Sequence, residues 1–189
     1  MGEAFGVFTK EYGYSINALY KNMVNDIVGT VHLITVNARF VQDPVWSLGI
    51  LSTLELLLKN YPEAGMYERI ASALFKSCNL DEATIRADAA SLLEFVKGKT
   101  KEEIETILKE GDDSILGNVA SNVKADEFWM YSKFFGVGLL KIMEKTGVDM
   151  DKDEVYPVME SWMSAQLGRS HLTACVSLFF LNPFARGNP

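Results

Sequence analysis

The apolar residues of this 189-residue chain recur at steps of three and four along almost its whole length, and this periodicity limits the possible folds most strongly. Such spacing gathers apolar side chains on one stripe of an α-helix. No stretch alternates with the period of two that a half-buried β-strand requires. The clearest stripe contains Ile16, Met23, Ile27 and Val31. We therefore predict an all-α fold: a multi-helix bundle with a short irregular apolar C-terminal tail.

Local signals predict where these helices begin and end. Asp43-Pro44 is a strong start signal, because Asp accepts hydrogen bonds from first-turn amides and Pro fits the first helical position. Thr100 and Glu103 have the spacing of a capping box. Helices are predicted over about 15–36, 43–60, 63–77, 81–96, 100–111, 114–123, 133–146 and 154–168, with Ser15, Asp81 and Ser132 as further caps. The chain accordingly divides into an N-terminal extension (1–14), a helical bundle domain (15–169) and an apolar C-terminal tail (170–189).

The helix predicted over 43–60 is apolar around most of its circumference, so we expect it to be the most buried. Glu55 on this helix would then be a core carboxylate, which must pair or shift its pKa. A structural ion pair with Arg39, Arg69 or Arg86 is the expected solution. Gly136 and Gly138 are expected to let a neighbouring helix approach closely.

The polar residues Asp43, Tyr61 and Arg86 are assigned to fold maintenance. Asp43 would cap a helix, Tyr61 with Pro62 would end one, and Arg86 would lie exposed or in an ion pair. A partner-binding face is the alternative for this group.

Charge and hydropathy exclude several functional classes. The net charge of −7 argues against nucleic-acid binding, which needs a basic surface. No window reaches the ~18 uninterrupted apolar residues of a membrane-spanning helix, and the apolar run 172–181 is too short. The first ten residues lack the features of a signal or transit peptide. Any membrane association is therefore expected to be peripheral.

Two aromatic segments are candidates for partner binding. Phe128 and Trp129 precede the predicted cap Ser132, and packing into the chain's own core is the favoured interpretation of this aromatic run. An interface is the alternative, because exposed aromatic side chains favour one. The tail contributes a second set, for which burial against the chain's own bundle and docking on a membrane protein or lipid interface are equally open. This second set is Leu178, Phe179, Phe180 and Phe184.

Catalytic and metal-binding motifs are weak or absent. The sequence has no Gly-rich phosphate loop, nucleophile elbow, HExxH or CxxC motif, so an enzyme is the least favoured class. Four acidic residues, Asp149, Asp151, Asp153 and Glu160, match EF-hand positions one, three, five and twelve. Position six holds Glu154 where a calcium loop needs Gly. We therefore favour an acidic helix cap over calcium binding.

Several segments, in order, resemble the thylakoid formation family. Residues 14–20 (YSINALY) are close to that family's RPINSIY opening, although Gly13-Tyr14-Ser15 replaces its Arg-Pro. Residues 31–37 (VHLITVN) and 43–49 (DPVWSLG) look like its "HLLSVN … YDP…ALG" block. Tyr61-Pro62, 85–89 (IRADA) and 131–139 (YSKFFGVGL) match three further family segments. The resemblance covers residues ~10 to 146, about seven-tenths of the chain, and the C-terminus departs from the family's long charged helix.

The resemblance implies an all-α, non-enzymatic accessory protein that has no known cofactor and no catalytic residues to carry over. Family members support photosystem II biogenesis and repair and associate with the FtsH protease, which places this chain at chloroplast or cyanobacterial thylakoids. The expected partners are photosystem proteins or an FtsH-type protease. A permanent peripheral subunit of a photosystem–antenna complex is the alternative. In such a complex His171, just before the apolar tail, could ligate a chlorophyll magnesium.

Overall fold

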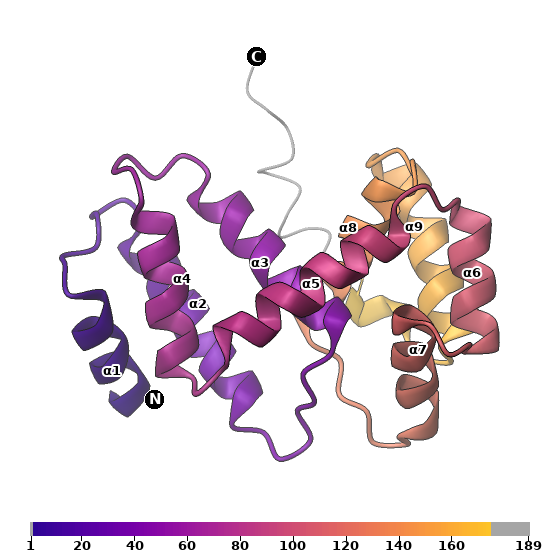
Figure 1. Cartoon of the computed structure of the whole chain (residues 1–189), viewed down its shortest axis with the longest axis horizontal. Coiled ribbons are helices and arrows are strands. Elements are labelled where there is room, and N and C mark those ends of the chain that lie inside the picture. The colour runs from indigo at the N-terminus through magenta and orange to yellow at the C-terminus, as the bar shows by residue number, and fades with distance from the viewer. Residues whose placement is uncertain (1, 175–189) are drawn as a thin grey trace. The chain divides into compact units, whose positions relative to one another are not determined.

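The computed structural model describes residues 2–174, which form nine α-helices and one π-helix and contain no β-strand (Figure 1). The predicted all-α class is confirmed. These residues group into two compact units, one of residues 2–41 and 54–85 and one of residues 42–53 and 86–174. The helices are α1 (Gly2–Tyr12), α2 (Lys21–Thr35), α3 (Pro44–Leu58), α4 (Met66–Ser77), α5 (Glu82–Val96), α6 (Lys101–Glu110), α7 (Ile115–Ala125), α8 (Lys133–Lys145), α9 (Lys152–Glu160) and the π-helix η1 (Ser161–Gln166).

The first unit contains a helix that the sequence prediction treated as an extension. Ala4, Phe8 and Tyr12 recur every fourth residue, so they share one face of α1, and all three are buried. α1 packs against α4 and α2. The boundary predicted at residue 15 therefore does not separate the N-terminal residues from this unit.

The second helix begins later than predicted. Ser15 does not cap it, because the chain first makes a turn in which the Leu19 amide donates to Asn17 Oδ1 at 3.0 Å. The turn is joined to the end of α3: Tyr61 Oη accepts from the Asn17 amide at 3.0 Å, and Tyr20 Oη donates to the Asn60 carbonyl at 2.7 Å. A side-chain-closed turn of this kind competes with helix, which moves the start to Lys21.

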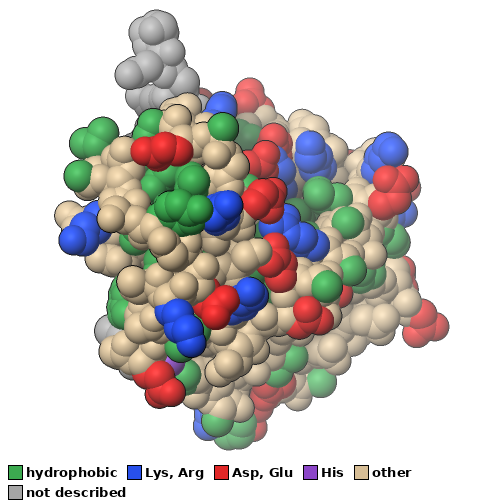
Figure 2. Space-filling model, turned by 60° about the vertical axis from the view of Figure 1, so that its left-hand side comes forward, with side chains coloured by type: hydrophobic (Ala, Val, Ile, Leu, Met, Phe, Trp, Pro, Cys, Tyr) green, Lys and Arg blue, Asp and Glu red, His purple; other side chains and the backbone are tan. Residues whose placement is uncertain are grey.

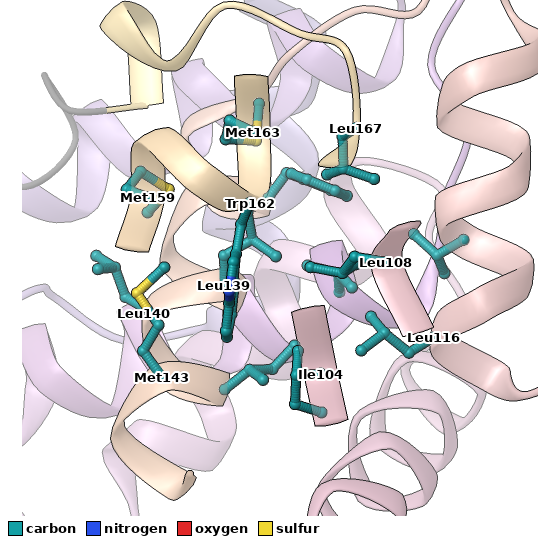
Figure 3. Packing of buried hydrophobic residues seen from close by; sticks show 14 of the residues in the cluster. Ile104, Leu108, Leu116, Leu139, Leu140, Met143, Met159, Trp162, Met163 and Leu167 are labelled. Atoms are coloured by element: carbon teal, nitrogen blue, oxygen red, sulfur yellow. The ribbon is translucent and has the colours of Figure 1, made fainter. Parts of the chain in front are cut away.

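The second unit is built around Trp162, which is fully buried (Figure 3). In this view Leu139 and Met143 of α8 and Ile104 and Leu108 of α6 surround the indole. Pro157 lies inside α9, and the chain continues from α9 as the π-helix that carries Trp162. Apolar side chains from well-separated segments thus form one core.

The first part of α3 and α8 approach each other unusually closely in this unit. A Cβ atom placed on Gly49 would collide with the Phe134 carbonyl oxygen, and one placed on Gly138 would collide with the Val45 carbonyl oxygen. The predicted role of Gly138 is confirmed. A Cβ on Gly136 would instead meet the Tyr131 hydroxyl, so this glycine does not serve a neighbouring helix.

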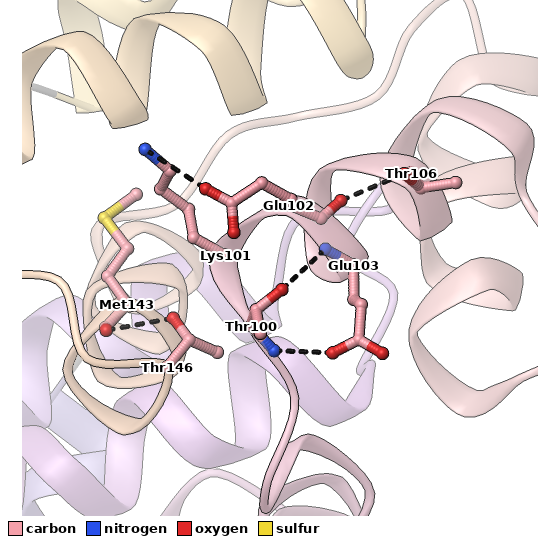
Figure 4. Close-up of polar contacts among 7 residues, drawn as sticks. All are labelled: Thr100, Lys101, Glu102, Glu103, Thr106, Met143 and Thr146. Atoms are coloured by element: carbon pink, nitrogen blue, oxygen red, sulfur yellow. Dashed lines mark hydrogen bonds and ion pairs between the residues drawn. The ribbon is translucent and has the colours of Figure 1, made fainter.

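Most of the predicted caps are present. Thr100 and Glu103 form the reciprocal capping box of α6, with the Glu103 amide donating to Thr100 Oγ1 at 3.3 Å and the Thr100 amide donating to Glu103 Oε2 at 2.7 Å (Figure 4). Asp43 accepts from the Trp46 amide at 2.9 Å. Ser132 caps α8, and Asp151 caps α9.

The prediction of a core carboxylate at Glu55 is wrong, because its side chain is exposed. Buried residues of α3 such as Trp46, Ile50 and Leu54 lie on other faces of the helix. Where a helix is apolar almost all round, its pattern does not reveal which narrow strip meets water. Between residues 2 and 174, no helix combines the length and apolar character needed to cross a bilayer.

Candidate interaction surface

The turn between α7 and α8 presents the predicted aromatic pair. α7 ends at Ala125, and Asp126 then closes a tight turn: its side chain accepts from the Phe128 amide at 3.0 Å, and its carbonyl accepts from the Trp129 amide at 3.0 Å. Ser132 starts α8 six residues later, accepting from the Phe135 amide at 3.2 Å. The conformation of residues 126–132 is therefore fixed at both ends.

The two aromatic side chains of this turn have different environments. Trp129 is half-buried and lies edge-on to Phe135 and Tyr131, with ring centroids 5.0 and 6.3 Å apart. The Phe128 side chain is 59% exposed. Trp129 is thus the more buried of the two side chains, and Phe128 is the more exposed.

Arg169, far along the chain, holds the turn in place. Its Nη2 donates to the Val123 carbonyl at 2.5 Å and also to the Asp126 carbonyl, and its Nη1 lies 3.5 Å from the Glu127 carbonyl. The guanidinium carbon is 5.8 Å from the centroid of the Trp129 ring. A cation at the end of α7 also complements the partial negative charge of the free carbonyls there.

Sequence reasoning did not identify Arg169. It lies more than 40 residues from the carbonyls that it binds, and no local pattern marks a side chain for such a contact. The four tail candidates, Leu178, Phe179, Phe180 and Phe184, lie outside the described residues.

His171 already uses both ring nitrogens. Nε2 is 3.1 Å from the Tyr156 hydroxyl, and Nδ1 is 2.9 Å from Ser164 Oγ. Ser164 in turn donates to the Arg169 carbonyl at 3.2 Å. If Ser164 gives its proton to that carbonyl, it accepts from Nδ1, and Nε2 accepts from Tyr156. Ligation of a chlorophyll magnesium by His171 would require one of these bonds to break.

The EF-hand-like acidic residues do not converge. Asp151 accepts from the Asp153 amide at 3.2 Å as the cap of α9, as predicted. Across residues 2–174, no three or more His, Cys, Asp or Glu side chains are grouped as a metal site would need. Calcium binding by Asp149, Asp151, Asp153 and Glu160 stays an untested alternative.

A second polar cluster surrounds Asp43 in the same unit. Asp88 accepts from Gln42 Nε2 at 3.3 Å and from Ser47 Oγ at 3.4 Å, so two carboxylates lie near the start of α3. Burial raises the pKa of Asp43 to about 7, and the charge of Asp88 adds to the increase, against the effect of the amides of Trp46 and Val45. Gln42, Ser47 and the Trp46 amide, all within this unit, donate to the two carboxylates, which is consistent with the predicted role of Asp43 in fold maintenance.

Outside the turn, the surface is mixed. On the face drawn in Figure 2, acidic and basic side chains are interspersed, with hydrophobic side chains between them. The first unit exposes several apolar side chains, of which Leu19 is the most accessible at 89%. The rest of this set is Val7, Tyr14, Leu33, Val36 and Val41. Single exposed apolar residues are common on soluble surfaces and need no partner.

Comparisons with known proteins agree with the resemblance seen in the sequence. A family profile described as "Thylakoid formation protein" matches residues 1–179, beyond the segments that carry the resemblance. A protein Thf1 of Cyanothece sp. is 29% identical over 151 residues, which cover 78% of this chain and 64% of the relative. Protein THYLAKOID FORMATION 1, chloroplastic, of Arabidopsis thaliana is 27% identical over 146 residues, 76% of this chain and 49% of the relative.

The chain thus spans about half to two thirds of the length of these curated relatives. A solved structure of Psb29 superimposes with a TM-score of 0.82 and 18% identity, over 96% of this chain and 94% of that one. This likeness shows that the fold is shared. The cyanobacterial and chloroplastic relatives agree with the predicted thylakoid or chloroplast location.

Proposed function

The chain belongs to the thylakoid formation protein family, and from this premise we propose that it is a non-enzymatic accessory protein of thylakoid membranes that serves photosystem II biogenesis or repair. Family membership is the observation that carries the proposal. The fold shared with Psb29 supports it. The protein acts by contact with other proteins rather than by a reaction of its own.

Its partners are photosystem proteins or an FtsH-type thylakoid protease, and Phe128 is the first contact residue. Phe128 is 59% exposed, and its turn is held by a hydrogen bond from the Phe128 amide to Asp126 at one end and from the Phe135 amide to Ser132 at the other. Aromatic side chains in such settings provide much of the affinity of protein interfaces. Contact is transient, as a biogenesis factor requires.

The test is affinity capture from detergent-solubilised thylakoid membranes of the organism that makes the protein, followed by mass spectrometry. We expect sub-stoichiometric recovery of photosystem II subunits or FtsH, and loss of both with Phe128→Ser. Leu19→Ser is the matched control, because Leu19 is a more exposed apolar residue in the other unit. Stoichiometric recovery with an intact photosystem would instead favour a permanent peripheral subunit. Recovery of neither would refute the proposal.

A further inference from the structure

We propose that Met66 is a site of reversible oxidation, at which conversion of the thioether to a sulfoxide by hydrogen peroxide weakens the packing of α1 on α4. Methionine sulfoxide is returned to methionine by sulfoxide reductases, so such a modification can act as a switch. The inference goes beyond the proposed function and does not depend on it, because it concerns a chemical change inside the first unit.

Met66 supplies a hydrogen-bond acceptor to a buried hydroxyl group. The residue begins α4, and the Tyr12 hydroxyl of α1 donates to its Sδ atom at 3.7 Å. The Tyr12 side chain is only 3% exposed. Burial and the hydrogen bond with Tyr61 both raise the pKa of Tyr12, so the hydroxyl keeps its proton and needs an acceptor. The thioether thus satisfies a buried polar group where α1 meets α4.

The second hydroxyl group near Tyr12 is already engaged. Tyr61 Oη lies 3.4 Å from Tyr12 Oη and accepts from the Asn17 amide at 3.0 Å. A hydroxyl that donates to sulfur can also accept, so donation from Tyr61 to Tyr12 and from Tyr12 to Met66 satisfies both hydroxyl groups. Loss of the sulfur as an acceptor would therefore disturb this chain of hydrogen bonds from its end.

The oxidation is a two-electron oxygen transfer. The hydrogen bond from Tyr12 uses one lone pair of the sulfur, and the other can attack an oxygen of hydrogen peroxide. An S–O bond forms, the O–O bond breaks, and the released hydroxide takes the proton of the transferred oxygen and leaves as water. The sulfur is oxidised and the peroxide is reduced. Met66 is half-buried, whereas Met143, Met159 and Met163 are fully buried, so the oxidant reaches Met66 more easily.

Oxidation would act on the contact between two helices. The new oxygen lies on the lone pair away from Tyr12, and the sulfoxide sulfur, now partly positive, is a poor acceptor. Tyr12 must then move toward the new oxygen or lose its hydrogen bond, and a polar group enters a contact between helices. α1 packs against α4, and its buried residues are Ala4, Phe8 and Tyr12. The modification therefore loosens α1 and makes this buried face accessible.

The experiment treats the full chain with graded hydrogen peroxide, locates each methionine sulfoxide by peptide mass spectrometry and measures hydrogen exchange of the α1 amides. Sulfoxide at Met66 should speed this exchange roughly tenfold, because a buried donor loses its acceptor. Met66→Leu should abolish the response, and a methionine sulfoxide reductase should reverse it in the wild type. Met150→Leu is the matched control: Met150 is 44% exposed and lies in the other unit, so its replacement should leave the response of α1 unchanged.

Three results would overturn the proposal. Oxidation of Met150 that spares Met66 would show that the oxidant does not reach this sulfur. Oxidation of Met66 without faster exchange in α1 would show that Tyr12 transfers its hydrogen bond to Tyr61 at no cost. Tyr12→Phe has no hydroxyl to lose its acceptor, so an undiminished response in this variant would refute the mechanism. Should Met66→Leu fail to fold, wild-type protein oxidised to different extents decides the result, because the exchange rate of α1 should follow the sulfoxide content of Met66 and not that of Met150.

Discussion

Asp43 caps a helix from a buried position, where its carboxyl group is harder to ionise than in water. It caps α3 through the Trp46 amide, yet burial and the nearby Asp88 raise its pKa to about 7. In the unfolded chain an aspartate titrates near pH 4, roughly its reference value. Between these two values the folded protein retains a proton that the unfolded chain has released. The free energy of unfolding therefore falls as pH rises through this window.

We predict that Asp43→Asn removes this pH dependence. Asn still offers a side-chain oxygen to the Trp46 amide but has no charge to bury. Relative to the variant, the wild type should lose about 1 kcal/mol of unfolding free energy per pH unit between roughly pH 5 and 7. Urea denaturation at a series of pH values, followed by circular dichroism, measures the difference.

Asp81 provides the matched control. It caps α5 from an exposed position, accepting from the Ala83 amide at 3.1 Å and from the Thr84 hydroxyl at 2.6 Å, and these bonds lower its pKa. Its contribution is therefore lost as pH falls, so Asp81→Asn should change the pH profile in the opposite sense. If the unfolding free energy changes equally with pH in the wild type and in Asp43→Asn, Asp43 is ionised in the folded protein across this pH range.

At the scale of elements, the close approach of α3 and α8 depends on two glycines. We predict that Gly138→Ala is destabilising, because the added methyl would collide with the Val45 carbonyl and force the helices apart. Overpacking of this kind costs about 1–3 kcal/mol. The thermal unfolding midpoint is the measurement.

Gly6 is the control for this substitution. It lies inside α1, and a Cβ there meets no atom within 4 Å. Alanine in a helix interior is more stable than glycine by roughly 0.5–1 kcal/mol, so Gly6→Ala should raise the midpoint. A rise with Gly138→Ala would show that the helices have room to separate.

The capping box of α6 gives an independent test of element stability. Thr100→Ala removes the acceptor of the Glu103 amide and should cost about 1 kcal/mol. Thr106, on the same helix, bonds only back to the Glu102 carbonyl at 2.9 Å. Thr106→Ala should be near neutral, because alanine has the higher helix propensity. Equal effects of the two substitutions in chemical denaturation would contradict a special role for the cap.

Sequence signals predicted the helices and their caps better than the tertiary neighbours of individual side chains. Asp43, Thr100 and Ser132 were predictable as caps, because the backbone amides that they satisfy lie within three residues. α1 was missed even though Ala4, Phe8 and Tyr12 repeat every fourth residue, since no cap or proline marks its start. The exposure of Glu55 and the clamp by Arg169 depend on tertiary neighbours, which no local pattern encodes.

At the scale of the whole molecule, the candidate surface could be predicted only in part. For Phe128 and Trp129 the sequence left core packing and an interface open, and the structure treats the two side chains differently: Trp129 packs on Phe135, and Phe128 is 59% exposed. The difference arises in the non-helical turn between α7 and α8, where Trp129 also lies close to the Arg169 guanidinium. Membership of the family supplies a functional context that the turn alone would not give.

Residues 2–174 form the two described units, and truncation after residue 174 tests the contribution of the apolar tail. Ala174 is fully buried in the core of the second unit, and His171 bonds Tyr156 and Ser164. We predict that a protein ending at residue 174 keeps its helical circular dichroism and binds its partner more weakly, because the tail carries Leu178, Phe179, Phe180 and Phe184. A protein ending at residue 169 loses these packing and hydrogen-bonding contacts as well, so it should also melt at a lower temperature. Loss of helical signal on removal of 175–189 alone would show that the tail completes the core, and unchanged binding would restrict the interface to the turn at Phe128.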